Sequence, residues 1–340
     1  MKANSLPKGT SITGSNCVIA DDGKITKRVS FTEISEYFRD EFSGGGGRPL
    51  VGIARSRNLL RNSNFSRKSL VVNQKGRDTY EGSGYGIDGW KSTGSKSVQT
   101  LEEDGWVIHD TDGGLGQYQQ VIEDAEATAL NGVELTASIL VDIRTGGPFQ
   151  FGLFSSVYHA MEAAPLSAGI HLLTHTETMT DITSTLQYFI SPRATNAKVI
   201  ACQLEPGDRQ TLAHKDTAGN WVLNNPLPNR ALELLRCQQY FNVARTSFGT
   251  QSLSTAISDT NGMIGFPFFF PTAMRCVPAV SFTGTLRVHG QGQDFQNVES
   301  IMYTTVQDNI VNVFVGGLQP LTTYTLDGHP SVELYFDSSP

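Results

Sequence analysis

The apolar residues between Asn58 and Gly207 come in short runs separated by turn-forming residues, and this pattern constrains the fold more than any other feature. Short runs of this kind are typical of antiparallel strands, because an amphipathic helix needs apolar residues at helical spacing over a longer stretch. About eight such strands can close two sheets face to face as a jelly roll. We expect strands at 69–72, 105–109, 116–121, 135–143, 149–158, 169–174, 186–190 and 198–204.

A second group of strand patterns follows a stiff connector. Asn225-Pro226-Leu227-Pro228-Asn229 joins the two groups, and Asn229 can cap a short helix that carries Leu232, Leu235 and Cys237. Strand patterns recur beyond it and predict a second, smaller β domain. They lie at 262–270, 279–282, 285–289, 301–305, 310–315 and 332–336.

The N-terminal residues predict a separate attachment segment. Cys17–Ala20 is apolar and precedes the turn signal Asp21–Lys24, which indicates a small hairpin or an extended arm. Ser30-Phe31-Thr32-Glu33 is a capping box, and the helix that it starts must end at Ser43–Gly47. One stripe of this helix is apolar and either buries against copies of itself or a partner protein, or packs back on the sandwich. The stripe is Phe31, Ile34, Phe38 and Phe42.

These patterns together predict a mainly β chain in three parts. Residues 1–47 form an attachment segment with a short helical anchor and a glycine linker. Residues 48–228 form an antiparallel jelly-roll β-sandwich, and residues 229–340 form a short helix and the smaller C-terminal β domain.

Composition excludes several classes of function. The net charge of −7 and the isoelectric point near 5.5 argue against a nucleic-acid binder, because such proteins concentrate Lys and Arg. The basic run Arg55–Lys68 is interspersed with Asn and Ser, which indicates a solvated linker and first-strand surface. The start lacks a secretory signal, and the apolar cluster Phe266–Phe270 is too short to cross a bilayer. We expect cytoplasmic synthesis without membrane insertion.

The four cysteines indicate free thiols rather than a metal site. Cys17, Cys202, Cys237 and Cys276 are widely spaced, with no Cys-x-x-Cys pair. Cys237 and Cys276 lie within apolar patterns that are typical of buried thiols. Cys17, in the attachment segment, is the thiol most open to oxidation.

The sequence offers no convincing catalytic or metal site. Acidic residues lie mostly in turns such as Glu102–Asp104, whereas glycoside hydrolysis needs two carboxylates across one sugar bond. Asp110–Gly114 weakly resembles a calcium loop but lacks the third acid and the distal glutamate. His171 and His175 are too far apart along a strand for easy coordination of one ion. We therefore expect neither an enzyme nor a cofactor.

A sugar site requires aromatic rings that stack on a pyranose and polar groups that bond its hydroxyls. One predicted hairpin carries both kinds of residue, and Trp221 in a polar stretch is an alternative exposed ring. The competing interpretation is that Trp90 and Trp106 are core residues. The candidate set on the hairpin is Trp106, His109, Asp110, Gln117, Tyr118 and Gln119.

Three motifs near the start of the sandwich occur in a familiar order. They are NLLRNSNF at 58–65, NQKG at 73–76 and YGIDGW at 85–90. In the last motif, Tyr85, Ile87 and Trp90 favour a half-buried pleated strand. The order resembles the jelly-roll domain of bacteriophage tail-fibre and prophage structural proteins, which reads Asn-Leu-Leu-x-Asn-Ser-x-Phe, Asn-Gln-Arg-Gly and Tyr-x-Ile-Asp-Arg-Trp. Lys75 and Gly89 replace the two arginines of that pattern.

Later segments extend this resemblance to about residue 281. QLEPG at 203–207 is similar to the family's closing Gln-Leu-Glu-x-Gly, and ELLRCQQYF at 233–241 follows it with Gln239 in place of arginine. FPTAMRCVPAV at 270–280 is similar to the segment that opens a small terminal domain in such fibres.

The resemblance implies a virion component made in the cytoplasm of a bacterial host. Such fibres are commonly homotrimers, and their N-terminal segment, here residues 1–47, attaches to other virion proteins. The first hypothesis is a tail or collar fibre whose copies jointly bind host surface polysaccharide. The second is a structural head, collar or baseplate fibre or adaptor without a sugar site. The third is a capsule depolymerase.

Overall fold

The computed structural model describes residues 16–21, 24–30, 58–110, 116–160, 164–193, 196–224, 228–246, 251–290 and 294–339. The chain divides into two compact units, Met1–Asn58 and Leu59–Pro340. In the first unit, β1 (Asn16–Asp21) and β2 (Lys24–Ser30) pair antiparallel, which confirms the predicted hairpin. The predicted helical stripe of Phe31, Ile34, Phe38 and Phe42 lies outside the described residues, and so does the thiol of Cys17.

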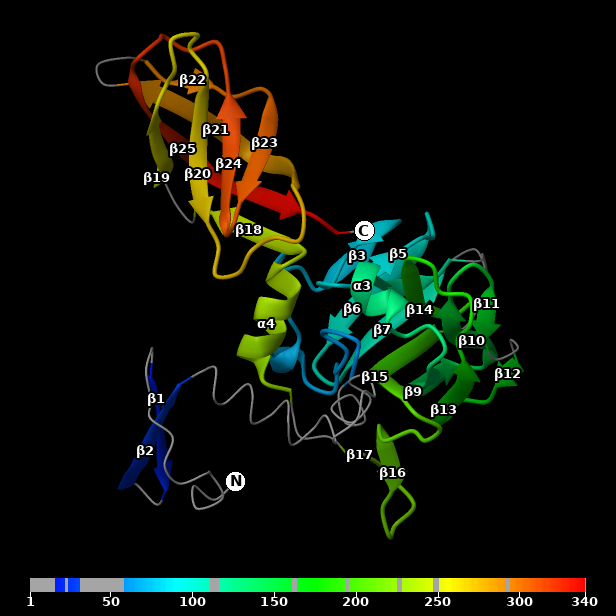
Figure 1. The fold of residues 1–340 in the computed structure, drawn as a ribbon. Coiled ribbons are helices and arrows are strands. Elements are labelled where there is room, and N and C mark those ends of the chain that lie inside the picture. Colours follow the sequence, from blue (N-terminus) through cyan, green and yellow to red (C-terminus); the bar gives the residue numbers. More distant parts are fainter. Residues whose placement is uncertain are drawn as a thin grey trace. The chain divides into compact units, whose positions relative to one another are not determined.

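The second unit begins with a sandwich of two antiparallel sheets (Figure 1). The seven-stranded sheet has the order β11-β10-β14-β8-β5-β4, with β12 also beside β10. Its strands are β4 (Gly84–Tyr85), β5 (Lys91–Ser92), β8 (Tyr118–Glu123), β10 (Gly147–Phe154), β11 (Tyr158–Ala160), β12 (Ala164–Leu166) and β14 (Thr185–Ser191).

The six-stranded sheet has the order β13-β9-β15-β7-β6-β3. The chain crosses repeatedly from one sheet to the other, and the mainly β jelly-roll sandwich predicted from the sequence is confirmed. The strands of this sheet are β3 (Thr79–Glu81), β6 (Ser97–Glu102), β7 (Gly105–Asp110), β9 (Glu134–Thr145), β13 (Gly169–Thr178) and β15 (Asn196–Pro206).

The sandwich core is built by the period of two along its strands. In β10, Phe149, Phe151 and Leu153 are fully buried between the sheets, whereas the residues between them face outward. Aromatic rings fill the centre, where Trp90 and Trp106 lie with ring centroids 5.2 Å apart. Such ring pairs bury a large apolar area in specific geometry, which stabilises one arrangement of the two sheets.

Three sequence predictions within the sandwich were wrong in detail. Residues 69–72 are not a strand, because a 3₁₀ helix, η2 (Lys68–Leu70), occupies this place. The predicted strand 149–158 is broken by a bend into β10 and β11. Only Tyr85 of the motif 85–90 is in a strand, at the end of β4. The residues after it form a turn, since the Trp90 N–H donates to the Ile87 carbonyl and Gly89 has φ +83°.

The helix predicted after the connector is confirmed as α4 (Arg230–Gln238). The Asn229 side chain accepts hydrogen bonds from the N–H groups of Ala231 and Leu232, at 3.0 and 3.4 Å. Cys237 is buried, but Leu232 is 58% exposed, so the apolar side of α4 is only partly covered. No helix among the described residues is long and apolar enough to span a membrane.

The remaining strands form a small β domain with its own core. One sheet has the order β18-β25-β21-β22 with β19 also beside β25, and the other has the order β20-β24-β23. The strands are β18 (Phe241–Arg245), β19 (Gln251–Ile257), β20 (Ile264–Phe269), β21 (Ala279–Gly290), β22 (Gln296–Asn297), β23 (Tyr303–Gln307), β24 (Ile310–Val315) and β25 (Thr323–Asp337).

Two predictions in this domain need correction. The strands expected at 279–282 and 285–289 are one strand, β21, with a bulge at Gly284. Gly284 has φ +83°, and a Cβ there would lie 2.2 Å from the Ser331 carbonyl oxygen, so only glycine fits this bulge. Cys276 is exposed rather than buried, whereas Cys202 and Cys237 are buried free thiols.

Candidate functional site

The two rings predicted to stack on a sugar lie inside the core. Trp106 and Tyr118 have no exposed surface, and their ring centroids are 5.5 Å apart in a T-shaped arrangement. The Tyr118 hydroxyl lies 2.8 Å from the carbonyl oxygens of Val98 and His109. A ring without exposed surface cannot contact a glycan, so both predicted roles are corrected to core packing.

The other predicted residues are distributed over different surfaces. Gln119 is partly exposed on β8 of the seven-stranded sheet, and Gln117 is partly exposed just before that strand. His109 belongs to the six-stranded sheet. The side chain of Asp110 lies outside the described part of the chain. Trp221 packs with the small cluster on the opposite sheet, with the Lys215 Nζ 5.1 Å from its ring centroid. The structure therefore brings together only the two glutamines.

The outward face of the seven-stranded sheet combines amides with aromatic side chains. Strand pairing places Lys91, Gln119, Phe189 and Gly152 in one row across β5, β8, β14 and β10. A neighbouring row on the same face contains Gln187, Phe154 and Tyr158. We call this surface the open face, and its defining residues are Gln117, Gln119, Phe154, Tyr158, Gln187 and Phe189.

Tyr158 is the exposed ring that the sequence analysis missed. It is 61% exposed, although its ring centroid lies 4.7 Å from Phe154 and 5.4 Å from Phe189. Gln117 Nε2, in the segment just before β8, donates to its hydroxyl at 3.3 Å. Two aromatic supports and one hydrogen bond hold the ring in place while most of its surface remains open to solvent. Strand alternation along β10 places Phe154 outward, but the bend at 155–157 interrupts it, so the exposure of Tyr158 follows from the pairing of β11 with β10.

Gly152 makes room for Tyr158 and its strand. A Cβ at Gly152 would lie 2.5 Å from the His159 carbonyl oxygen and 2.6 Å from the Ala160 Cα. Any larger residue would therefore push β11 away from β10. The sequence Phe151-Gly152-Leu153 thus allows the edge strand to approach the open face.

His159, the residue after Tyr158 on β11, links β11 to the six-stranded sheet. Its Nδ1 lies 2.8 Å from Glu177 on β13, and its Nε2 lies 3.0 Å from Asp181. Burial opposes the charged form, but hydrogen bonds to the two carboxylates outweigh burial and raise the pKa of His159. The Ser155 hydroxyl, together with Ser156 and His159, lowers the pKa of Asp181. Because both ring nitrogens face carboxylates, the imidazolium form fits this clamp best.

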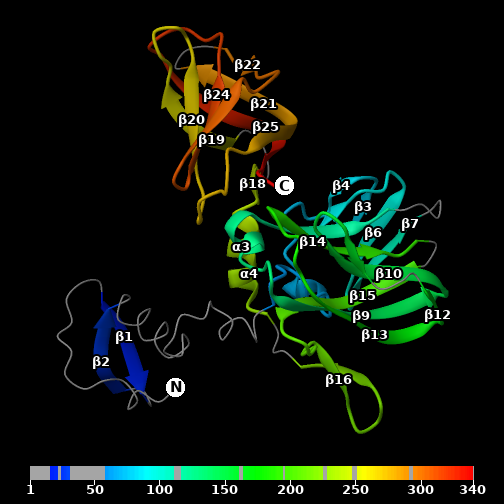
Figure 2. The ribbon, with the colours of Figure 1, turned by 45° about the vertical axis from the view of Figure 1, so that its right-hand side comes forward.

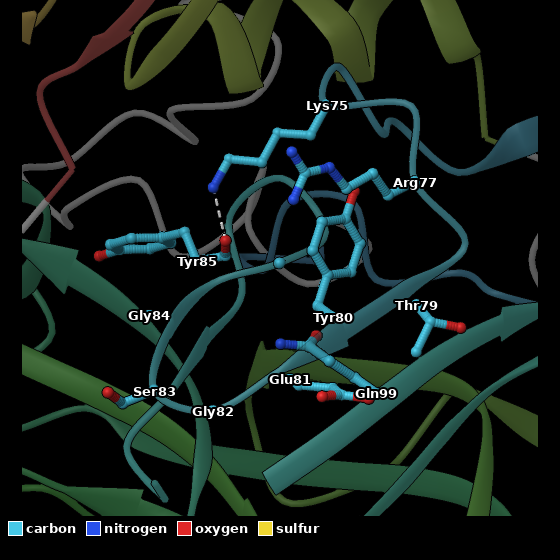
Figure 3. A pocket seen from close by; sticks show the side chains of 11 residues that line it. Lys75, Arg77, Thr79, Tyr80, Glu81, Gly82, Ser83, Gly84, Tyr85 and Gln99 are labelled. Carbon is cyan, nitrogen blue, oxygen red and sulfur yellow. Dashed lines mark hydrogen bonds between the residues drawn. The ribbon is translucent and has the colours of Figure 1, made fainter. Parts of the chain in front are cut away.

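A separate pocket lies at the other edge of the sandwich. It holds about 520 Å³ and opens where β3 and β4 meet (Figure 3). In Figure 3 the Lys75 side chain runs toward the Tyr85 carbonyl, Arg77 lies above the ring of Tyr80, and Gln99 lies below that ring. We call this the edge pocket; its side chains come from Lys75, Arg77, Thr79, Tyr80, Glu81, Ser83, Tyr85 and Gln99.

Most polar groups of the edge pocket already have partners. Lys75 Nζ donates to the Tyr85 carbonyl at 2.6 Å, and burial lowers the pKa of Lys75. The Tyr80 hydroxyl donates to Asn73 Oδ1 at 2.5 Å, and burial raises the pKa of Tyr80 to about 12. The Arg77 guanidinium has no hydrogen bond or ion pair with any described residue.

Lys75, Tyr85 and Gly86 of the three motifs line the pocket, and other motif residues support it from behind. Asn62, with φ 47°, donates from Nδ2 to the carbonyls of Val72 and Asp88, both at 2.8 Å. Trp90 Nε1 donates to the Asn62 carbonyl at 2.9 Å. The Asp88 carboxylate accepts the Gln74 N–H at 2.6 Å, and burial raises the pKa of Asp88 to about 7. This network fixes the loop that carries Lys75 and Arg77.

No family model and no curated protein matches the chain. Among solved structures it is similar to one described as "CBM4 structure and function", with 18% identity over 40% of this chain and 94% of that one, at a TM-score of 0.28. It is also similar to the N-terminal CBM22-1–CBM22-2 tandem domain from Paenibacillus barcinonensis Xyn10C, with 8% identity over 84% of this chain and 100% of that one, at a TM-score of 0.27. At these TM-scores neither likeness assigns a ligand to this chain.

Proposed function

We propose that this chain binds a neutral polysaccharide through the open face, without catalysis. The observation that carries the proposal is the exposure of Tyr158 on its supports Phe154 and Phe189. A supported ring with exposed surface can stack on the apolar face of a pyranose, and it loses little conformational freedom when it does so.

The polar groups around Tyr158 suit hydroxyl groups rather than charges. Gln117, Gln119 and Gln187 each offer an amide donor and acceptor on the same side of the sheet. Glu123, at the end of β8, already forms an ion pair with Arg275. An amide-lined aromatic surface therefore favours a neutral sugar chain lying across the strands.

The arrangement also supports binding rather than hydrolysis. Glycoside hydrolysis needs two carboxylates placed on either side of one sugar bond. Glu177 and Asp181, the two carboxylates that contact the neighbouring residue His159, both bond to its single imidazole. They hold β11 in place through His159, so they are not arranged as a pair across a sugar bond on the open face.

The biological role that we propose is a bacteriophage tail or collar fibre that attaches to host surface glycan. The support is the order of the motifs at 58–65, 73–76 and 85–90, together with an exposed ring suited to sugar. If several copies assemble, as in a homotrimer, the overall affinity for the polysaccharide would exceed the weak affinity of one open face. In this proposal residues 1–47 attach the fibre to other virion proteins.

One observation favours the alternative of a structural fibre or adaptor. The outward side of the β20-β24-β23 sheet carries exposed apolar residues beside polar ones such as Asn312, with Phe269 69% exposed and Tyr303 stacked on Phe314 at 4.3 Å. Exposed apolar faces of this kind often contact other proteins. Light scattering on the intact chain and on Phe269→Glu tests this role, because loss of a multimer in the variant would assign the face to assembly.

The glycan proposal is tested by Tyr158→Ala in electrophoresis through gels that contain neutral polysaccharides. We expect the variant to lose the retardation that the unchanged protein shows with its polysaccharide. Tyr303→Ala is the matched control, since Tyr303 is also an exposed tyrosine stacked on a phenylalanine. Equal retardation of the Tyr158 variant and the unchanged protein would remove the open face as the binding site.

A further inference from the structure

The edge pocket differs from the open face in the charge that it presents. Arg77 and Lys75 bring two cations to its lining, and Glu81 brings one carboxylate. Lys75 is half-buried and already donates to the Tyr85 carbonyl. The guanidinium of the exposed Arg77 makes no hydrogen bond or ion pair with a described residue, although its charge helps to lower the pKa of Glu333. The guanidinium is therefore the group in this pocket that can accept an anionic partner without breaking an existing contact.

Gln99 provides a second, independent indication of a ligand. Its side chain lines the edge pocket and is only 2% exposed, yet its Oε1 has no hydrogen-bond partner in the described part of the chain. A buried acceptor without a donor is unfavourable, and a ligand hydroxyl would remove that cost. Gly86 lies against this amide, since a Cβ there would be 2.5 Å from the Gln99 side chain. The turn at Gly86 thus makes space for the amide.

We propose that the edge pocket binds an acidic saccharide. The planar Arg77 guanidinium would pair with the carboxylate through two parallel hydrogen bonds, which is the geometry that arginine favours. The Tyr80 ring forms an apolar wall for the sugar, and Gln99 Oε1 accepts a hydrogen bond from a sugar hydroxyl. The volume of about 520 Å³ lies within the range of small-molecule sites. This site is separate from the open face and does not depend on it.

The test is a calorimetric and NMR titration of the full chain with D-glucuronate, D-glucose and acetate. We expect glucuronate to bind about tenfold or more tightly than either of the others, since only it offers both the carboxylate and the hydroxyls. Arg77→Gln should weaken glucuronate binding by about tenfold and leave any glucose binding unchanged. Arg67→Gln, at an exposed arginine outside the pocket, is the matched control and should bind glucuronate normally.

Two further outcomes decide the assignment. If acetate binds as tightly as glucuronate, the pocket is a simple anion site and the saccharide assignment is overturned. Glucuronate binding that survives in Tyr158→Ala supports a site separate from the open face, whereas its loss there overturns the proposal. Tyr158→Ala should remove neutral-polysaccharide binding and Arg77→Gln should weaken acidic-saccharide binding, so the two proposals fail in different measurements.

Discussion

The two outer faces of the sandwich differ in what covers them. On the six-stranded sheet, Leu140 and Ala201 are buried beneath Leu212, Ala213 and Trp221 from the base of a hairpin, β16 (Ala213–Lys215) and β17 (Trp221–Leu223). Figure 2 shows that the rest of this hairpin projects away from the sandwich. On the seven-stranded sheet, the Tyr158 ring packs against Phe189, which is fully buried. Tyr158 itself is 61% exposed.

This difference shows that an aromatic side chain on the outside of a sheet can either pack within the chain or remain open for binding. The Trp221 ring packs against a small apolar cluster of the same chain, and this contact buries part of its surface. Tyr158 rests on similar apolar support, yet it is 61% exposed and surrounded by glutamine amides. An aromatic side chain is a candidate binding surface when residues of the same chain pack against one face of its ring and the other face is exposed to solvent.

The largest effect should come from placing the same charge on the two faces. Leu140→Asp buries an unpaired carboxylate beneath the hairpin and should lower the free energy of unfolding by about 3 kcal/mol or more. Gln119→Asp, on the open face, should change it by less than about 0.5 kcal/mol. Urea denaturation of the two variants measures the contrast. Equal losses would contradict the claim that only one face is covered.

Gly152→Val should damage the open face through its edge strand. The new side chain would collide with the backbone of His159 and Ala160, so we expect a loss of about 1–3 kcal/mol in stability and loss of polysaccharide retardation. Gln150→Val places the same side chain at the preceding outward position of β10 and is the control. A Gly152 variant that binds and unfolds normally would show that β11 does not need this glycine.

Trp221→Ala should separate packing from binding. Removal of a half-buried ring from the covered face should cost about 1–2 kcal/mol of unfolding free energy, because the cluster around Leu140 becomes exposed. Polysaccharide retardation should not change. If Trp221→Ala kept its stability and lost polysaccharide binding, Trp221 would be a binding residue, and the packing role that we assign to it would be wrong.

The smallest effect should be a pH dependence of the His159 clamp. The pKa of His159 is raised in the folded chain, so its stabilising contribution is complete below its ordinary pKa of about 6.5 and is lost as pH rises through the folded value. We expect polysaccharide affinity to fall over the same alkaline range, by less than about tenfold. His159→Gln should have a flatter pH profile, measured by affinity electrophoresis at several pH values. An identical profile in the variant would show that another group titrates.

Sequence periodicity predicted the sandwich but not the site. The short runs gave most of the strands and both β domains, because alternation follows directly from strand geometry. The same alternation explains the error at the hairpin. Tyr118 points inward while Gln117 and Gln119 point outward, so the ring and the two amides could not share one surface.

The rest of the candidate site depends on contacts between distant segments. Phe189 supports Tyr158 only because β14 and β10 pair with Gly152 opposite Phe189. The edge pocket likewise combines Arg77 from a loop with Gln99 from β6. Neither combination has a fixed spacing in sequence, so no local pattern indicated it.

The most direct test of the account is an NMR map of side-chain amides during titration with a neutral oligosaccharide. We predict that the signals of Gln117, Gln119 and Gln187 shift together, because all three lie on the open face. The signal of Gln203, which is buried on the covered face and donates to Thr211, should stay unchanged. Saturable binding that leaves the three glutamine signals unmoved would contradict the assignment of the open face as the glycan site.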